Sequence, residues 1–311
     1  MDQAVRRQGL GGSDIAAILG LDDHRDPFGV YQEKTGQLSP TVPTFRMKLG
    51  KYCERGIIHC YTDLTGRPTE FLDLLQVHPE RPWMLYTPDA VCTQEKRGVD
   101  AKLVQWDQRD LWGEGPDDIP FRAQLQGHWY MAAMDYPVWD FIAIIDAQPR
   151  IYSIHRDLEI EAYILGRAEA FWRDHILAGK PPRIGSSESS ARYLRERFPR
   201  HREVIRPANL AEVRMLEQYA GFRVTFDQMT TEKKGLENAI KQAIGEDAGL
   251  AWSGGRFTWK RTKDSQTTDW RALAQSLMGD RTEEEQKALA QAFTTPEAGV
   301  RRMDFRLEKA S

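Results

Sequence analysis

The sequence has few cysteines and no long apolar run. Its three cysteines, Cys53, Cys60 and Cys92, show no C-x-x-C spacing and cannot all pair, which predicts reduced thiols and excludes a four-cysteine zinc or iron–sulfur site. No segment approaches the ~18 apolar residues that a membrane helix requires. The opening residues, MDQAVRRQG, lack the apolar core of a secretory signal. We therefore expect a cytoplasmic protein with no membrane partner.

An excess of charge of one sign is also missing, since the net charge is −3 over 311 residues. The distribution of charge is more informative. Residues 191–206 carry six arginines against two glutamates, and residues 254–263 carry four basic residues and no acidic one. Aromatic residues alternate with these charges, which suits contact with a nucleic-acid backbone and stacking on bases. A solvated surface is the alternative interpretation.

Hydrophobic periodicity and turn residues predict an α/β core. Helices are expected from Ser13 or a neighbour to Gly20, from Pro27 to Gly36, over residues 43–65, over 117–135 and over 158–182. In the helix over 43–65, one face gathers Phe45, Leu49, Ile57, Tyr61 and Leu64. Strands are expected over residues 82–91, 98–106, 137–146 and 150–157.

The rest of the chain has a different character. The small polar run IGSSESSARY predicts a linker or mobile loop. A long helix is expected to begin beyond Pro207. Residues spaced by three and four along it fit a helical hairpin or a short coiled coil, namely Phe226, Met229, Lys233, Leu236, Ile240 and Ala243. The predicted organisation is a catalytic domain over 1–185, a basic linker over 186–206, and a helical extension with a short strand or hairpin over 207–311.

The stretch PDAVCTQEKRGVDAK, residues 88–102, places acidic residues and a lysine on a predicted hairpin. Asp100 and Lys102 share one face of a strand because side chains alternate, and the hairpin brings Asp89 close to them. Carboxylates are ligands for Mg²⁺, and a lysine beside the metal orients water or neutralises charge in phosphodiester hydrolysis. A charged surface hairpin is the simpler alternative.

Polar residues on the flanking helices extend this pattern. Glu54 lies on the helix before the hairpin, from which it can reach the metal. Gln124, Gln126 and Tyr130 lie on the helix after it, where an amide could face the lysine, the water or a nucleotide. The seven histidines form no H-E-x-x-H cluster, so a zinc site is not indicated.

Several motifs resemble the YqaJ-type viral recombinase family, which is related to lambda exonuclease within the PD-(D/E)XK nuclease superfamily. They are GLGGSDIAAILGL, EKTG, GKYCERGI, TPDA, DAK, AQLQGHWYM and AFWRDHILAGKPP, in the family's order and spacing over about residues 5–182. The resemblance implies a restriction-endonuclease-like α/β fold, a mixed central sheet flanked by helices. It also implies a Mg²⁺-dependent DNA exonuclease, in which Mn²⁺ can substitute.

The resemblance also implies roles for single residues. Glu54, Asp89 and Asp100 are the metal carboxylates, Lys102 is the catalytic lysine, and Gln124 ends the motif set with Gln126 and Tyr130 in support. Arg6, with Arg7 as an adjacent alternative, binds the DNA 5′-phosphate together with Ser13 and Thr87. Asp100 departs from the glutamate that most of the family carries, which predicts altered metal geometry.

The implied activity is digestion of linear double-stranded DNA from the 5′ end, leaving 3′ single strands for phage-type recombination. Implied partners are double-stranded DNA ends, a single-strand annealing protein and further copies of the chain in a homo-oligomer, a trimer by family analogy. The implied compartment is a bacterial or phage-infected host cytoplasm. Two alternatives remain open: an endonuclease or structure-specific nuclease using the same site, and a DNA-binding scaffold that no longer cleaves.

Overall fold

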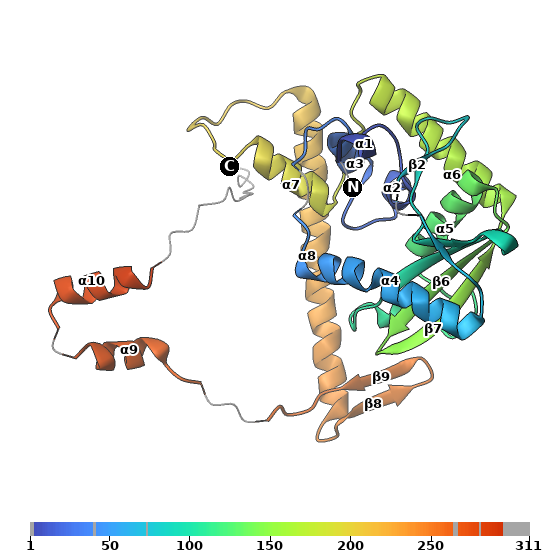
Figure 1. Ribbon diagram of the computed structural model, residues 1–311. Helices are drawn as coiled ribbons and strands as arrows, with labels where there is room; N and C mark the ends of the chain where they lie inside the picture. Colours follow the sequence, from blue (N-terminus) through green and yellow to red (C-terminus); the bar gives the residue numbers. More distant parts are fainter. Residues whose placement is uncertain (1–2, 40–41, 73, 264–266, 280, 295–311) are drawn as a thin grey trace. The chain divides into compact units, whose positions relative to one another are not determined.

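The computed structural model describes residues 3–39, 42–72, 74–263, 267–279 and 281–294 (Figure 1). The chain divides into two compact units, Met1–Pro199 and Arg200–Ser311. Among the described residues, no helix combines the length and the apolar character needed to cross a membrane.

A five-stranded mixed sheet forms the centre of the first unit, in the order β1-β4-β5-β6-β7. Its strands are β1 (Glu70–Phe71), β4 (Ala90–Cys92), β5 (Arg97–Leu103), β6 (Val138–Ile145) and β7 (Gln148–His155). β5 and β6 are parallel, and the other neighbours are antiparallel. The expected segment 82–91 does not form one strand, because β3 (Leu85–Tyr86) pairs with β2 (Gln76–Val77) in a separate sheet before Thr87 and Pro88.

Helices cover both faces of this sheet (Figure 1). α4 (Phe45–Thr65) packs on one face, and its Ile58 and Tyr61 share an apolar cluster with Val99 and Ile142 of β5 and β6. The opposite face is covered by α2 (Gly12–Ile18), α5 (Phe121–Met134) and α6 (Leu158–Phe171), which continues as a π turn over Trp172–Leu177. α1 (Gln3–Arg6) and α3 (Pro27–Lys34) complete the N-terminal part.

The helix boundaries follow local signals in the sequence. Gly20, Gly36, Gly66 and Gly179 adopt positive φ just beyond α2, α3, α4 and the turn after α6, as helix-terminating glycines do. The expected apolar face of α4 is not buried at the two ends of the helix, where Phe45 and Leu64 are 76% and 56% exposed. Only the stretch around Ile57 and Tyr61 reaches the sheet.

A buried aspartate ties the sheet to α4. Tyr61 Oη donates to Asp140 Oδ2 at 2.6 Å, while Arg97 and Ser153 donate to Asp140 Oδ1 at 2.6 and 2.7 Å. Burial and the Asp140 carboxylate raise the pKa of Tyr61, so the phenol stays protonated as a donor. These bonds join β5, β6, β7 and α4.

The Ser-rich segment is not a linker, as the sequence suggested, but part of the first unit. Ser187 caps α7 (Glu188–Arg197), and the hydroxyls of Ser187 and Ser190 each donate to Asp26 Oδ2 at 2.7 Å. Asp26 in turn caps α3 by accepting from Gly29 N. The serines are therefore buried partners of a buried carboxylate, a role that composition alone cannot distinguish from a linker.

The second unit contains the long helix expected beyond Pro207, α8 (Leu210–Ile244), which runs uninterrupted and does not fold into a helical hairpin. Asn209 and Glu212 form a capping box at its start. A two-stranded hairpin follows, β8 (Gly249–Trp252) with β9 (Gly255–Thr258), and then α9 (Trp270–Met278) and α10 (Glu283–Ala292). Residues 295–311 of the predicted extension lie outside the described part of the chain.

Candidate active site

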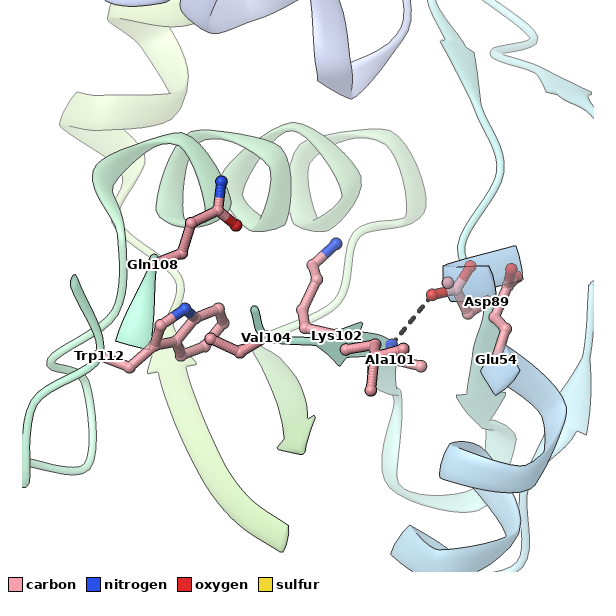
Figure 2. Close-up of a pocket in the computed structure, with 9 residues that line it drawn as sticks. Glu54, Asp89, Ala101, Lys102, Val104, Gln108 and Trp112 are labelled. Atoms are coloured by element: carbon pink, nitrogen blue, oxygen red, sulfur yellow. Dashed lines mark hydrogen bonds between the residues drawn. The ribbon is translucent and has the colours of Figure 1, made fainter. Parts of the chain in front are cut away.

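The β4–β5 hairpin gathers the three residues that define the site. Asp89 stands just before β4 and accepts a hydrogen bond from Ala101 N through Oδ2 at 2.9 Å (Figure 2). Asp100 and Lys102 lie on the same face of β5, and Lys102 Nζ is 3.0 Å from Asp100 Oδ2. Alternation along the strand therefore places these groups together as the sequence predicted.

Carboxylates hold Lys102 in its charged form. Burial alone would lower the pKa of Lys102, but Asp100 and Asp89 outweigh burial and raise it above the ordinary value. Lys102 Nζ also donates to Gln126 Oε1 at 3.1 Å. The ammonium is thus a fixed, protonated donor.

A short polar chain connects Lys102 to the segment before the hairpin. Gln126 Nε2 lies 3.0 Å from Tyr130 Oη, and Tyr130 Oη donates to the carbonyl of Thr87 at 3.4 Å. Because Gln126 and Tyr130 are four residues apart on α5, both face the hairpin. These bonds link Lys102 to α5 and to the segment that precedes β4.

The structure does not place Gln124 with this group. Gln124 Nε2 donates to the carbonyl of Ile119 at 3.0 Å, and its side chain lines a different, mainly apolar pocket with Leu125 and His128. Residues two apart on a helix point about 200° apart, so Gln124 and Gln126 cannot both face Lys102. The predicted supporting role of Gln124 is therefore wrong for this conformation, and Gln126 occupies that place.

Carboxyl groups crowd around Asp89. Burial, the Asp100 carboxylate and a hydrogen bond with Glu54 raise the pKa of Asp89 to about 8, which favours its protonated form. Glu54 reaches this point from α4, where its side chain is 18% exposed and pairs with Lys51 at 2.6 Å. Three carboxyl groups thus converge on one region beside the half-buried Lys102.

Glu54, Asp89 and Lys102 border a pocket of about 320 Å³. Figure 2 shows Asp89 and Glu54 at one end, Gln108 and Trp112 at the other, and Lys102 between them. The sequence analysis did not single out Gln108 or Trp112, which come from the connection between β5 and α5. That connection carries no periodic pattern, so nothing in the sequence marks these residues as pocket walls.

The donor set suits a hard divalent cation. Asp100 is only 2% exposed, and its Oδ1 is buried without a hydrogen-bond partner, while Oδ2 contacts Lys102. A cation near Asp89 and Asp100 would satisfy this oxygen and relieve the repulsion that raises the pKa of Asp89. In the described part of the chain, no three His, Cys, Asp or Glu side chains are gathered closely enough to hold an ion. Water or substrate oxygens would therefore complete the coordination, as Mg²⁺ commonly allows.

The N-terminal segment runs beside the hairpin. Leu10 N donates to the carbonyl of Trp83 at 2.6 Å, and Leu85 N donates to the carbonyl of Leu10 at 2.8 Å. A Cβ on Gly9 would lie 2.5 Å from the Trp83 carbonyl, so this close approach requires glycine. The segment between Arg6 and Ser13 is thereby held next to the strand that leads to Thr87.

The predicted phosphate-binding residues come from three segments of the first unit. Tyr130 Oη donates to the backbone carbonyl of Thr87 at 3.4 Å, and Arg6 is exposed at the end of α1. Ser13 is exposed on α2 and follows Gly12, whose Cβ position lies 3.1 Å from Gln126 Cγ. Gly11, rather than Ser13, is the N-cap of α2.

Asp14 anchors the Gly-Gly-Ser segment, a role that the sequence analysis did not assign. Asp14 pairs with Lys34 at 2.7 Å and Arg25 at 2.9 Å, and it accepts from Gly11 N at 2.9 Å. Burial opposes its charge, but the two cations outweigh burial and hold the pKa of Asp14 well below its usual range. Its partners lie 11 and 20 positions away in the chain, so local spacing does not reveal them.

A mixed sheet covered by helices on both faces carries an acidic pair and a lysine on its β4–β5 hairpin. Residues 3–137 match the family described as YqaJ-like viral recombinase domain. The resemblance inferred from the sequence motifs is confirmed. The uncharacterized protein YqaJ of Bacillus subtilis (strain 168) is 26% identical over 262 residues, covering 82% of this chain and 81% of that protein.

Among solved structures, the chain is similar to an alkaline exonuclease (LHK-Exo) from Laribacter hongkongensis. That likeness has a TM-score of 0.47 and 17% identity, and it covers 56% of this chain and 91% of the other. A phage-related exonuclease from Haemophilus somnus 129PT gives a TM-score of 0.42 at 13% identity, over 55% of this chain and 96% of the other. These likenesses are partial.

Proposed function

We propose that the protein is a metal-dependent deoxyribonuclease that digests linear double-stranded DNA from the 5′ end and leaves 3′ single strands. The observation that carries this proposal is the placement of Asp89, Asp100 and protonated Lys102 on one hairpin, with Asp89 and Lys102 lining one pocket and a buried Asp100 oxygen left without a partner. The match of residues 3–137 to a viral recombinase family supports a role in DNA recombination.

We propose Mg²⁺ as the cofactor, with Mn²⁺ able to substitute. Asp89 and Asp100 would hold the ion, with Glu54 assisting directly or through water. When bound, the ion supplies charge stabilisation on the phosphoryl oxygens and activates water. Lys102 cannot accept a proton while its pKa is raised, so its ammonium orients the attacking water or neutralises developing charge. Gln126 and Tyr130 keep that ammonium in place.

Arg6, Ser13 and Thr87 are proposed to bind the terminal 5′-phosphate. Their support is the position of their segments. α2, which carries Ser13, packs through Gly12 against Gln126, Tyr130 contacts the Thr87 carbonyl, and Arg6 precedes the segment that pairs with Trp83 and Leu85. A terminal phosphate held here would set both the register and the direction of digestion. The guanidinium supplies charge, and the two hydroxyls supply neutral donors.

End-labelled duplex digestion with Mg²⁺ tests activity and direction together. We expect release of 5′-terminal nucleotides from a linear duplex, a preference for 5′-phosphate over 5′-hydroxyl, and no cutting of closed circles. Equal cutting of circular and linear DNA would replace the exonuclease proposal with an endonuclease. Release from the 3′ end alone would reverse the proposed direction.

We further propose a homo-oligomer, a trimer by family analogy, that works with a single-strand annealing protein in a bacterial or phage-infected host cytoplasm. The family's description as viral recombinases supports a partner that anneals the 3′ strands. Size-exclusion chromatography with light scattering, with and without DNA, tests the assembly. A single-chain mass under both conditions would overturn the oligomer.

A further inference from the structure

The β8–β9 hairpin carries one of the basic aromatic segments that the nuclease site does not use. Its strands pair with Trp252 opposite Gly255, and Leu250 opposite Phe257. Trp259 follows, donating through its backbone N–H to the carbonyl of Ala248 at 3.0 Å. Since residues two apart on a strand share a face, Trp252, Phe257 and Trp259 all project from one side of this ribbon.

This aromatic face is open to solvent. Trp252 is 60% exposed and Trp259 is 51% exposed, and Leu250 between them is 41% exposed. The Trp252 ring lies against Gly255, and a Cβ at residue 255 would lie 3.4 Å from the indole. The glycine therefore leaves room for the ring to pack on the backbone. Large aromatic side chains exposed together on one face mark an interaction surface.

Charge indicates what the surface contacts. From Gly249 to Lys263 the sequence contains Arg256, Lys260, Arg261 and Lys263 and no carboxylate. All four cationic side chains are exposed. An apolar protein partner would not require charge of a single sign, whereas the negative charge of a phosphate backbone complements these cations.

We propose that the β8–β9 hairpin is a stacking platform for single-stranded DNA. Trp252, Phe257 and Trp259 would stack on bases, which only an unpaired strand exposes, while Arg256 and Lys260 reach phosphates around the narrow edge of the ribbon. Aromatic side chains two residues apart lie ~6.8 Å apart, about twice the ~3.4 Å rise of a duplex strand. An extended, unstacked strand matches this spacing. This inference rests on the proposed function in one respect, which is that the nuclease would produce the single strand that the platform binds.

Fluorescence anisotropy tests the platform with the full-length chain and a labelled 20-nucleotide oligothymidylate. The measurement is made in EDTA, so that no cleavage contributes. Trp252→Ala and Trp259→Ala should each weaken binding about five-fold or more, because one base–aromatic stack is lost in each. Trp270→Ala is the matched control, since Trp270 is 74% exposed on α9 of the same unit, and it should bind as the wild type does.

The salt dependence reports the cationic part of the surface. Arg256→Gln and Lys260→Gln should each reduce the slope of log affinity against log salt by ~0.7. The proposal is overturned if the tryptophan variants bind the oligonucleotide as tightly as the control. It is also overturned if they lose thermal stability or change in mass with no loss of binding, since the face would then be a packing or self-association surface.

A parallel digestion of blunt duplex with Mg²⁺ separates this proposal from the nuclease. Tight oligonucleotide binding that depends on Trp252 and Trp259, in a protein without nuclease activity, supports the platform and rejects the enzyme. Duplex cleavage together with oligonucleotide binding that these substitutions do not change supports the enzyme and rejects the platform.

Discussion

Asp100 and Lys102 set the charge of the pocket, because they are neighbours on one face of β5 and both are largely removed from water. The notable feature of Asp100 is its second oxygen, which is buried without a partner. A buried carboxylate oxygen without a donor is costly unless a cation satisfies it. Asp100 is shorter than the glutamate that most of the family carries, but it still fits the role of a metal ligand. Its Oδ1 is available to the ion, while Oδ2 contacts Lys102.

Replacing Lys102 with alanine should abolish cleavage, with a rate loss of about 10²-fold or more, because a fixed donor to the reacting phosphate is removed. DNA binding should persist. Lys96→Ala is the control, since Lys96 is exposed at the turn of the same hairpin. Strong residual turnover in Lys102→Ala, measured by single-turnover digestion, would reject the catalytic assignment.

The two glutamines of α5 should behave differently. Gln126→Ala removes the hydrogen bond to the Lys102 ammonium. A bond to a charged group is worth about 1.5–3 kcal/mol, so the cleavage rate should fall about 10-fold or more. Gln124→Ala, which loses only its bond to the Ile119 carbonyl, should leave the rate near wild type. A larger loss of rate in Gln124→Ala would restore the role that the family resemblance implied.

Metal binding can be measured without DNA. Mg²⁺ or Mn²⁺ should raise the melting temperature of the wild type, because a ligand that binds only the folded chain stabilises it by an amount that grows with the logarithm of the free ion concentration. Asp100→Asn should abolish this increase, while Asp110→Asn, at an exposed position in the connection after β5, should retain it. An equal increase in both variants would place the ion elsewhere.

At the scale of elements, the contact between α3 and α7 depends on one carboxylate. Asp26 accepts from Ser187, Ser190 and Gly29, and it is only 8% exposed. Burial opposes its charge, but these hydrogen bonds outweigh burial and lower the pKa of Asp26. The N-terminal end of α7 is therefore held through its Ser-rich cap.

Asp26→Ala should lower the free energy of unfolding by about 2–3 kcal/mol, because two serine hydroxyls lose a charged acceptor. The pKa of Asp26 is lower in the folded chain, so its contribution is complete above the unfolded value near pH 4 and disappears as the pH falls through the folded value. Urea denaturation at pH 7 and pH 3 should show that the difference between wild type and variant shrinks at the lower pH. Asp23→Ala, at an exposed neighbour, should behave as the wild type.

At the scale of the whole molecule, α8 presents a heptad seam that the second unit does not bury. Phe222, Phe226, Met229 and Leu236 are 63–67% exposed and follow steps of four, three and seven. Lys233 occupies a position of the same seam, where a polar residue specifies register in coiled coils. Such a seam is suited to a second helix of the same period.

Combined replacement of Phe226 and Met229 by glutamate should therefore reduce the molar mass in solution to that of one chain. Thr231→Glu, on the opposite face of α8, should keep the mass of the wild type. Light scattering at several protein concentrations measures this difference. If the wild type already has the mass of one chain, the seam has no role in assembly. The same conclusion follows if the double variant keeps the mass of the wild type.

Much of the fold could be predicted from the sequence because its signals are local. Gly20, Gly36, Gly66 and Gly179 mark helix ends through their backbone freedom, and Pro120 precedes α5. The hairpin brought Asp89, Asp100 and Lys102 together as alternation required. Predictions that depended on burial were less reliable, as the exposed ends of α4 and the buried serines of α7 show.

The sequence by itself determined the order of the elements, the hairpin that gathers Asp89, Asp100 and Lys102, and the resemblance to a viral recombinase family, because periodicity, turn chemistry and motif spacing are properties of short segments. Only the tertiary structure decided that Gln126 rather than Gln124 faces Lys102, that Asp14 and Asp140 are buried anchors, and that Asp100 keeps an unpartnered oxygen. These outcomes depend on which residues distant in the chain exclude water from one another. Helix rotation and burial set those contacts, and neither is encoded in the spacing of neighbouring residues.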